Sequence, residues 1–192
     1  MTKQKINEFV LKGIFSSHCV RDLQSSGLLR TPTYSDQERK DHDLFVTASE
    51  AIRSGSVQMQ RLYRILYVFE NLVREFITNT LAEIDGDDWF NKRATKSMKD
   101  KLEKRKTSEE KNQWHTGRNQ HPLYYMDFGD LGLLIINHWD IFSDYFPDQA
   151  WVVSRVSDCE RTRNVIAHTN QLSSEEGARL EMYLRDWIKQ IG

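Results

Sequence analysis

Cysteine, proline and glycine are all scarce in this sequence of 192 residues, and each shortage narrows the classes of protein that it can encode. The two cysteines, Cys19 and Cys159, stand far apart and form no CxxC pair. This argues against a zinc site and a disulfide framework and favours a reducing compartment. Three prolines and nine glycines leave long uninterrupted segments, as in helical proteins. No segment sustains the two-residue alternation of a half-buried strand, so we predict an all-α fold.

Long apolar runs and an excess of charge are missing as well. No run approaches the roughly 18 apolar residues of a membrane-spanning helix. The N-terminal segment mixes charged with apolar residues, unlike a signal peptide. We therefore expect a soluble cytoplasmic protein with no membrane association. Because 27 Lys and Arg face 28 Asp and Glu, the formal net charge is −1, and only a local basic patch could attract nucleic acid strongly.

The apolar periodicity divides the chain into two parts. Residues 1–55 are expected to form an N-terminal helical extension, and residues 56–192 an antiparallel helical bundle. The bundle helices are predicted near residues 57–84, 130–145, 148–169 and 174–190. The first of them has the clearest apolar face at helical spacing.

Two local signals refine these boundaries. Ser54–Gly55–Ser56 is expected to bend or break the chain ahead of the first bundle helix, because glycine and serine favour turns. Ser173 and Glu176 have the spacing of a capping box, which predicts that the last helix begins there.

The stretch RTRNVIAH, residues 161–168, stands near the end of the third bundle helix and departs from the pattern of a buried helix. One stripe of this helix contains Val152, Val156, Cys159, Arg163 and Ile166. Arg163 thus occupies a position where a core residue is expected, and it requires a polar partner or a water-filled cleft. Asn164 and His168 lie together on a flank, and His168 is about 140° around the helix from Arg163.

An ordinary structural role also accounts for these three polar residues. A histidine near a helix C-terminus commonly complements the helix dipole. An arginine in an apolar stripe often keeps its guanidinium in water. On spacing alone, the structural role is favoured over a functional site.

A polar ribbon runs opposite the apolar face of the first bundle helix and consists of Tyr63, Tyr67, Glu70, Asn71 and Arg74. Glu70 and Arg74 have the i, i+4 orientation that favours an ion pair. A solvated face is the simpler interpretation of the ribbon. Glu70 would also suit Arg163 as a partner if these two helices pack side by side.

The six residues RNVIAH, from Arg163 to His168, resemble the defining motif of the HEPN superfamily. Further blocks resemble, in order, one HEPN branch that also occurs as a C-terminal module of larger RNA-processing proteins. These blocks are FENLVREFI (69–77), GDDWF (86–90), HPLYYMDFGDL (121–131), Trp139 and LSSEEGARLEMYLRDW (172–187). The resemblance covers about residues 57–191 and leaves the first 55 residues outside.

This resemblance implies a small helical bundle that commonly dimerises through its motif helices, and a metal-independent endoribonuclease with no cofactor. RNA would be cleaved by its own 2′-hydroxyl, giving a cyclic phosphate. Histidine transfers protons near neutral pH and arginine stabilises charge on phosphate, so the residue types suit the reaction. The resemblance makes Arg163 and His168 catalytic, Asn164 the polar motif residue, and Glu70, Asn71 and Arg74 supporting or RNA-binding residues.

The family also suggests a cellular role and partners. The role would be that of a toxin, of RNA processing, or of defence against phages and mobile elements. The partners would be RNA, a second copy of the chain, and a cognate antitoxin or larger defence complex. Two alternatives stay open: a non-catalytic HEPN module that binds RNA or a partner protein, and a structural protein whose Arg–Asn–His cluster merely stabilises the bundle.

Many Lys and Arg residues lie between Lys92 and Lys106. A solvated helix is the favoured interpretation of this stretch. The alternative is that it follows an RNA backbone, with Trp114, His115 and Arg118 beside it adding contacts to an unpaired base.

Overall fold

The computed structural model describes residues 18–19, 22–23, 26, 44–112 and 114–192. The chain divides into two units, residues 1–49 and 50–192. In the first unit, the described residues 18–19, 22–23 and 44–45 are helical, and the N-terminal helices expected there fall largely outside the described residues.

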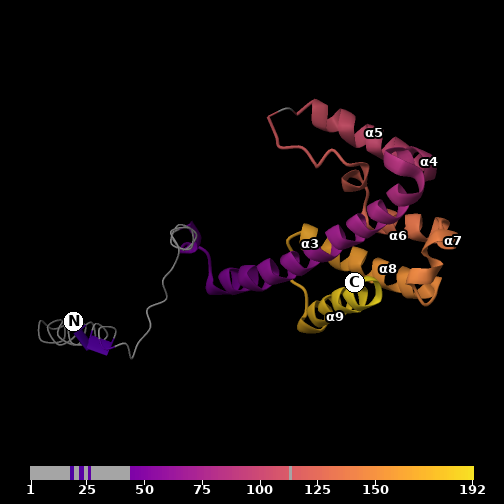
Figure 1. Ribbon diagram of the computed structural model, residues 1–192. Coiled ribbons are helices and arrows are strands. Elements are labelled where there is room, and N and C mark those ends of the chain that lie inside the picture. Colours follow the sequence, from indigo (N-terminus) through magenta and orange to yellow (C-terminus); the bar gives the residue numbers. More distant parts are fainter. Residues whose placement is uncertain (1–17, 20–21, 24–25, 27–43, 113) are drawn as a thin grey trace, which may run out of the picture. The chain divides into compact units, whose positions relative to one another are not determined.

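The second unit is built from helices, and no strand occurs among the described residues, which confirms the all-α prediction (Figure 1). Its α-helices are α3 (Glu50–Asp85), α4 (Trp89–Arg93), α5 (Lys96–Glu110), α6 (Phe128–Asn137), α7 (Trp139–Phe142), α8 (Gln149–Ala167) and α9 (Ser174–Ile191). Short 3-10 turns connect them: η1 (Gly86–Asp88), η2 (Pro122–Tyr125) and η3 (Ser143–Tyr145).

Helix α3 is the longest element and contributes one full face to the core. Its buried apolar residues recur every three or four positions: Leu62, Leu66, Phe69, Val73, Ile77 and Leu81. Helices α6, α8 and α9 all pack against it.

The helix break expected at Ser54–Gly55–Ser56 is wrong, because α3 continues through all three residues. Gly55 is buried against the Gln171 side chain, and a Cβ at Gly55 would lie 1.8 Å from Gln171 Nε2. One turn later, Gln58 Nε2 donates a hydrogen bond of 3.3 Å to the carbonyl of Leu172. This packing offsets the low helix propensity of the glycine.

The helix expected over residues 130–145 is interrupted. Helix α6 ends at Asn137, and His138 has a non-helical backbone (φ −120°, ψ 41°). The His138 imidazole is within hydrogen-bonding distance of the Arg93 carbonyl, with Nε2 3.0 Å from the oxygen. A tertiary contact to the last residue of α4 therefore accompanies the break at His138 between α6 and α7.

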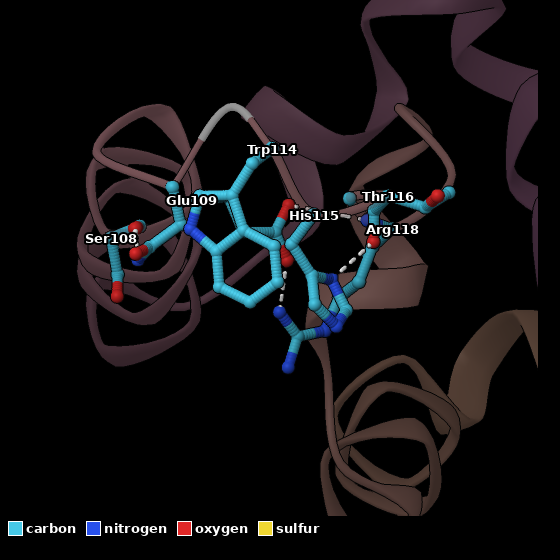
Figure 2. Close-up of a pocket in the computed structure, with 8 residues that line it drawn as sticks. Ser108, Glu109, Trp114, His115, Thr116 and Arg118 are labelled. Carbon is cyan, nitrogen blue, oxygen red and sulfur yellow. Dashed lines mark hydrogen bonds and ion pairs between the residues drawn. The ribbon is translucent and has the colours of Figure 1, made fainter.

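Helix α5 packs on the core through Met98 and Leu102, and a loop follows it. The N-cap residue of α5 is Thr95, whose side chain accepts a hydrogen bond from the Met98 amide. The loop that follows α5 returns along its last turn, where the Arg118 guanidinium pairs with Glu109 (Figure 2).

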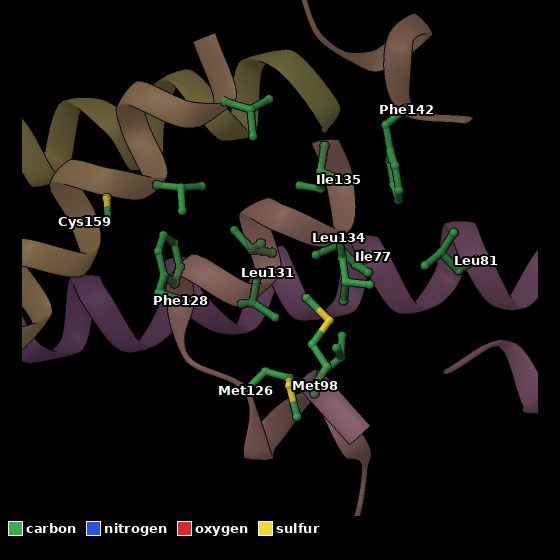
Figure 3. Packing of buried hydrophobic residues seen from close by; sticks show 14 of the residues in the cluster. Ile77, Leu81, Met98, Met126, Phe128, Leu131, Leu134, Ile135, Phe142 and Cys159 are labelled. Atoms are coloured by element: carbon green, nitrogen blue, oxygen red, sulfur yellow. The ribbon is translucent and has the colours of Figure 1, made fainter. Parts of the chain in front are cut away.

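The core lies where α3, α6 and α8 meet (Figure 3). Phe128, Leu131 and Leu134 of α6 are fully buried. Helices α6 and α8 approach closely at Gly132, since a Cβ there would lie 2.8 Å from a methyl carbon of Val156. The predicted capping box of Ser173 and Glu176 is present at the start of α9.

Candidate functional site

Helix α8 contains the RNVIAH motif, and it is buried on one side in its first part and more exposed towards its end. Asp148 caps its start by accepting a hydrogen bond of 2.7 Å from the Trp151 amide. Val152, Val156 and Cys159 are buried, as the predicted stripe requires. Arg163 and Ile166 are only partly buried, because the helix has moved towards solvent by that point. The predicted core position of Arg163 is therefore a half-exposed position at the edge of the bundle.

Arg163 makes its recorded contact within the motif. Its Nη1 donates a hydrogen bond of 3.3 Å to Oδ1 of Asn164, which is exposed. In the described part of the chain, no carboxylate lies within ion-pair distance of Arg163, so the expected pair with Glu70 is not formed. The contact to Asn164 thus orients the Arg163 guanidinium, which is not neutralised by a described carboxylate.

Glu70 is occupied by a residue of its own helix. Arg74, four residues later, donates to the Glu70 carboxylate, in the i, i+4 arrangement expected from the sequence. The two side chains are only 15% and 12% exposed. Arg74 also donates to the Leu123 carbonyl (3.2 Å) and lies over the Tyr124 ring, 4.8 Å from its centroid.

Of the polar ribbon on α3, Glu70 and Arg74 thus connect α3 to η2. Asn71 donates a hydrogen bond of 2.7 Å to the Tyr67 carbonyl of the same helix. No recorded contact among the described residues joins these three side chains to Arg163, Asn164 or His168. Their supporting role at the site stays a prediction.

His168 has a fixed backbone and an unengaged side chain. Its amide donates to the carbonyls of Asn164 and Ile166, which ends α8. Its carbonyl accepts hydrogen bonds from Thr169 Oγ1 (2.7 Å) and Asn170 Nδ2 (3.2 Å). The imidazole is exposed and has no recorded partner within the described residues.

The turn after His168 is unusual. The amides of Thr169 and Asn170 donate to the carbonyls of Ile166 (3.0 Å) and Val165 (3.1 Å), which is the Schellman arrangement of a helix C-terminus. Thr169 has a φ of 57°, a left-handed conformation that is rare for β-branched residues and usual for glycine. Local backbone strain of this kind occurs often at functional sites.

Asn164 and His168 continue one exposed face of α8. At a spacing of three or four residues, this face also contains Val153, Ser157 and Glu160. These three residues line an open hollow of about 380 Å³ between α8 and α6. The side of the hollow formed by α6 adds Leu133, which is 53% exposed, and opposite it Val153 is 52% exposed. The motif face therefore continues into an exposed apolar patch of Leu133 and Val153, beside which Lys101, Asp127, Asp130 and Glu160 line the same hollow.

A comparison with models of known protein families identifies the family of this chain. The model described as Swt1-like HEPN matches residues 64–192, about two thirds of the chain, including α8 and most of α3. The chain belongs to the HEPN superfamily. HEPN domains are often ribonucleases, so membership indicates an RNA-related function. No curated protein and no solved structure matches the chain.

One cation on the motif side of the HEPN domain was not singled out from the sequence. Arg161 precedes His168 by seven residues, which places the two within about 20° of each other around α8. The Arg161 side chain is 79% exposed, and its Nη1 is 3.7 Å from the Asp158 carboxylate. The i, i+7 spacing of Arg161 and His168 is present in the sequence, but the resemblance to the motif begins at Arg163 and leaves Arg161 outside.

One further group bears on the chemistry available to the HEPN domain. Burial raises the pKa of the Cys159 thiol to about 12, so this cysteine stays protonated and unreactive at neutral pH. Within the described ranges, no group of three or more His, Cys, Asp or Glu side chains is arranged to hold a metal ion.

None of the described helices has the length and apolar character needed to cross a bilayer.

Proposed function

We propose that this HEPN domain is an endoribonuclease that cleaves RNA without a metal ion. The observation that carries the proposal is the end of α8, where His168 has an exposed imidazole and the half-exposed Arg163 donates a hydrogen bond to Asn164. Neither group is engaged by a carboxylate in the described part of the chain. A purely structural Arg–Asn–His cluster would use these groups to bind the bundle, as Glu70 and Arg74 do.

The reaction that fits these groups is an internal transfer at phosphorus. The 2′-hydroxyl loses its proton to the His168 imidazole, and its oxygen bonds to the phosphorus. The bond from phosphorus to the 5′ oxygen breaks, and that oxygen takes up a proton from a general acid. The products are a 2′,3′-cyclic phosphate and a free 5′-hydroxyl. Arg163 stabilises the negative charge that grows on the phosphoryl oxygens.

A homodimer would complete the site. Within one chain, Arg163 and His168 project about 140° apart, so a single α8 provides one wall of a cleft. A twofold axis through the patch of Leu133 and Val153 would bring two motif faces together. The second copy would then add a second His168, and one imidazole would act as base while the other acts as acid.

The same 140° separation favours an alternative, a HEPN module that binds RNA or a partner protein without cleaving. We place either activity in the setting of a toxin, of RNA processing, or of defence against phages and mobile elements. A cognate antitoxin or a larger defence complex would be the protein partner.

The test is incubation of wild type and His168→Ala with a mixed RNA pool in excess chelator, followed by analysis of the product ends. Wild type should yield cyclic phosphate and 5′-hydroxyl ends, and His168→Ala should cleave about 10²-fold more slowly or worse. His18→Ala, which removes an exposed imidazole from the other unit, serves as the matched control. Cleavage by His168→Ala at the wild-type rate would exclude this site as the nuclease. Absence of cleavage by any of the proteins would favour the binding module.

A further inference from the structure

The charge of the chain is concentrated in one segment. Residues 92–118, here called the basic segment, contain ten Lys and Arg against four Asp and Glu, a surplus of six positive charges. The whole chain has a net charge of −1, so all other residues together carry a surplus of seven negative charges. A polyanion would therefore be attracted to this segment more strongly than to the rest of the chain.

Part of this charge is neutralised within the fold, and part of it is exposed. Lys101 and Arg105 pair with Asp127 of the α6 cap. Lys104 and Lys111 are exposed, and neither has a recorded carboxylate partner among the described residues. They are seven residues apart, so they lie on the same side of α5, roughly 10 Å from one another along its axis. This spacing suits contacts to separate phosphates of one strand.

Beside these lysines lies a hollow of about 440 Å³ with an aromatic wall (Figure 2). The last turn of α5 and the loop after it line the hollow with Ser108, Glu109, Trp114, His115, Thr116 and Arg118. Trp114 is 84% exposed, more than any other large hydrophobic residue that the structure describes. An indole that gains nothing from burial within its own chain is a typical contact surface for a ligand.

Hydrogen bonds at Glu109 hold another part of the wall of this hollow. Glu109 accepts from the Arg118 amide (3.2 Å), the Arg118 guanidinium and the Tyr125 hydroxyl (3.1 Å). Although burial would raise the pKa of this carboxyl, these hydrogen bonds hold it below its usual range. Glu109 therefore stays ionised at neutral pH, and its contacts anchor the loop that presents the indole.

His115 supports the indole and adds a polar group. Its ring meets the Trp114 ring edge to face, with centroids 5.4 Å apart. Its Nδ1 is 2.9 Å from the Thr116 carbonyl, which can only accept, so Nδ1 carries a proton and donates. In the neutral ring, Nε2 is then an acceptor that could meet an amino group of a base.

We propose that the Trp114 hollow binds an unpaired nucleobase of single-stranded RNA, while Lys104 and Lys111 contact the adjoining phosphates. A nucleobase matches the indole face by stacking and the polar rim by hydrogen bonds, and the charge of the basic segment matches the phosphates. Bases in a duplex are stacked on one another and are not accessible to this site. The proposal rests on the proposed function only in taking RNA as the ligand, and it does not require cleavage.

The experiment measures binding of a fluorescently labelled, unstructured RNA of about twelve nucleotides by anisotropy at fixed salt. His168→Ala protein is used throughout, so that the RNA stays intact. Trp114→Ala should weaken binding by about 5-fold or more, since stacking on one aromatic ring contributes about 1–3 kcal/mol per base. Trp114→Phe should retain most of the affinity. Met182→Ala removes an exposed apolar side chain of α9 and should bind as the parent protein does.

A duplex of the same length is the second ligand, and its affinity should not respond to Trp114→Ala. An equal loss for single strand and duplex would overturn the base-stacking site, as would no loss for either. Displacement of the labelled RNA by poly-glutamate as readily as by unlabelled RNA would overturn it too, because the site would then recognise charge alone. If single-strand binding depends on Trp114 but the wild-type protein cleaves no RNA, the base-stacking site is supported and the proposed nuclease activity is excluded.

Discussion

Thr169 combines a β-branched side chain with a left-handed backbone immediately after the motif histidine. Glycine adopts this conformation without steric cost. Thr169→Gly should therefore raise the free energy of unfolding by about 1 kcal/mol, even after loss of the Thr169 Oγ1 bond to His168. Urea denaturation measures the change. Thr162→Gly, inside α8, is the control and should lower the free energy by about 0.5 kcal/mol. A lowered value for Thr169→Gly would show that the turn stores no strain.

Arg163 shows what could and could not be predicted for single residues. Helical periodicity placed Val152, Val156 and Cys159 in the core, and all three are buried. The same periodicity placed Arg163 in the core stripe, but this residue is only partly buried, and the ion pair with Glu70 that was expected if the helices packed side by side is not formed. A helical angle gives the direction of a side chain but not the point at which neighbouring helices end. Glu70 instead pairs with Arg74, which lies four residues later on the same helix.

Helix α3 and the loop after the motif are coupled through Gly55. A Cβ at this position would overlap Gln171, although Gly→Ala inside a helix normally stabilises by about 1 kcal/mol. Gly55→Ala should thus destabilise wild type or leave it unchanged, and stabilise a Gln171→Ala protein by about 1 kcal/mol. Chemical denaturation of the four proteins of this double-mutant cycle tests the coupling. Equal effects of Gly55→Ala in both backgrounds would contradict it.

Asp127 holds α5 against α6. It caps α6 and accepts hydrogen bonds of 3.0 Å from both Lys101 and Arg105. Asp127→Ala should lower the free energy of unfolding by about 1–2 kcal/mol, because cap and charge are lost together. Asp127→Asn should cost less, since asparagine also caps helices. Asp100→Ala, at an exposed position of α5, is the control and should stay near wild type.

The contribution of Asp127 should also depend on pH. Burial alone would raise the pKa of this carboxyl, but Lys101 and Arg105 hold it below its ordinary value of 3.8. A carboxyl whose pKa is lower in the folded than in the unfolded protein stabilises the fold at pH values above its unfolded pKa. This stabilisation is lost as the pH falls through the folded pKa. The difference in the free energy of unfolding between wild type and Asp127→Asn should therefore be largest at about pH 6 and should shrink below about pH 4. A difference that grows on acidification would contradict the ion pairs.

Helix identities were largely readable from the sequence, whereas helix ends were not. The periodicity of residues 57–84 and 174–190 reflects burial of one face, and both helices are present. Helix α3 continues through Gly55, where it packs against the distant residue Gln171. The apolar helix is interrupted at His138, where the imidazole meets the distant Arg93 carbonyl. Contacts of that range leave no periodic signal in the sequence.

At the scale of the whole molecule, the exposed apolar patch beside the motif face predicts self-association. Wild type should sediment as a dimer at micromolar concentration. Leu133→Asp should give a monomer that cleaves RNA far more slowly, because a charge in the centre of an apolar interface is not paired. Met182→Asp, on an exposed position of α9, is the matched control and should remain dimeric. A wild-type monomer with full activity would exclude the composite site.

The uninterrupted course of α3 determines how short this domain can be made. The HEPN match begins at residue 64, yet Gly55 and Gln58 meet the loop that follows His168 a full two turns earlier on the same helix. A chain trimmed to the family boundary would lose Leu62 from the apolar core, together with the contacts that Gly55 and Gln58 make to Gln171 and Leu172 after the motif histidine. Expression of a working minimal domain should therefore start no later than Glu50, and a library of shortened versions would separate the residues needed for solubility from those needed for catalysis.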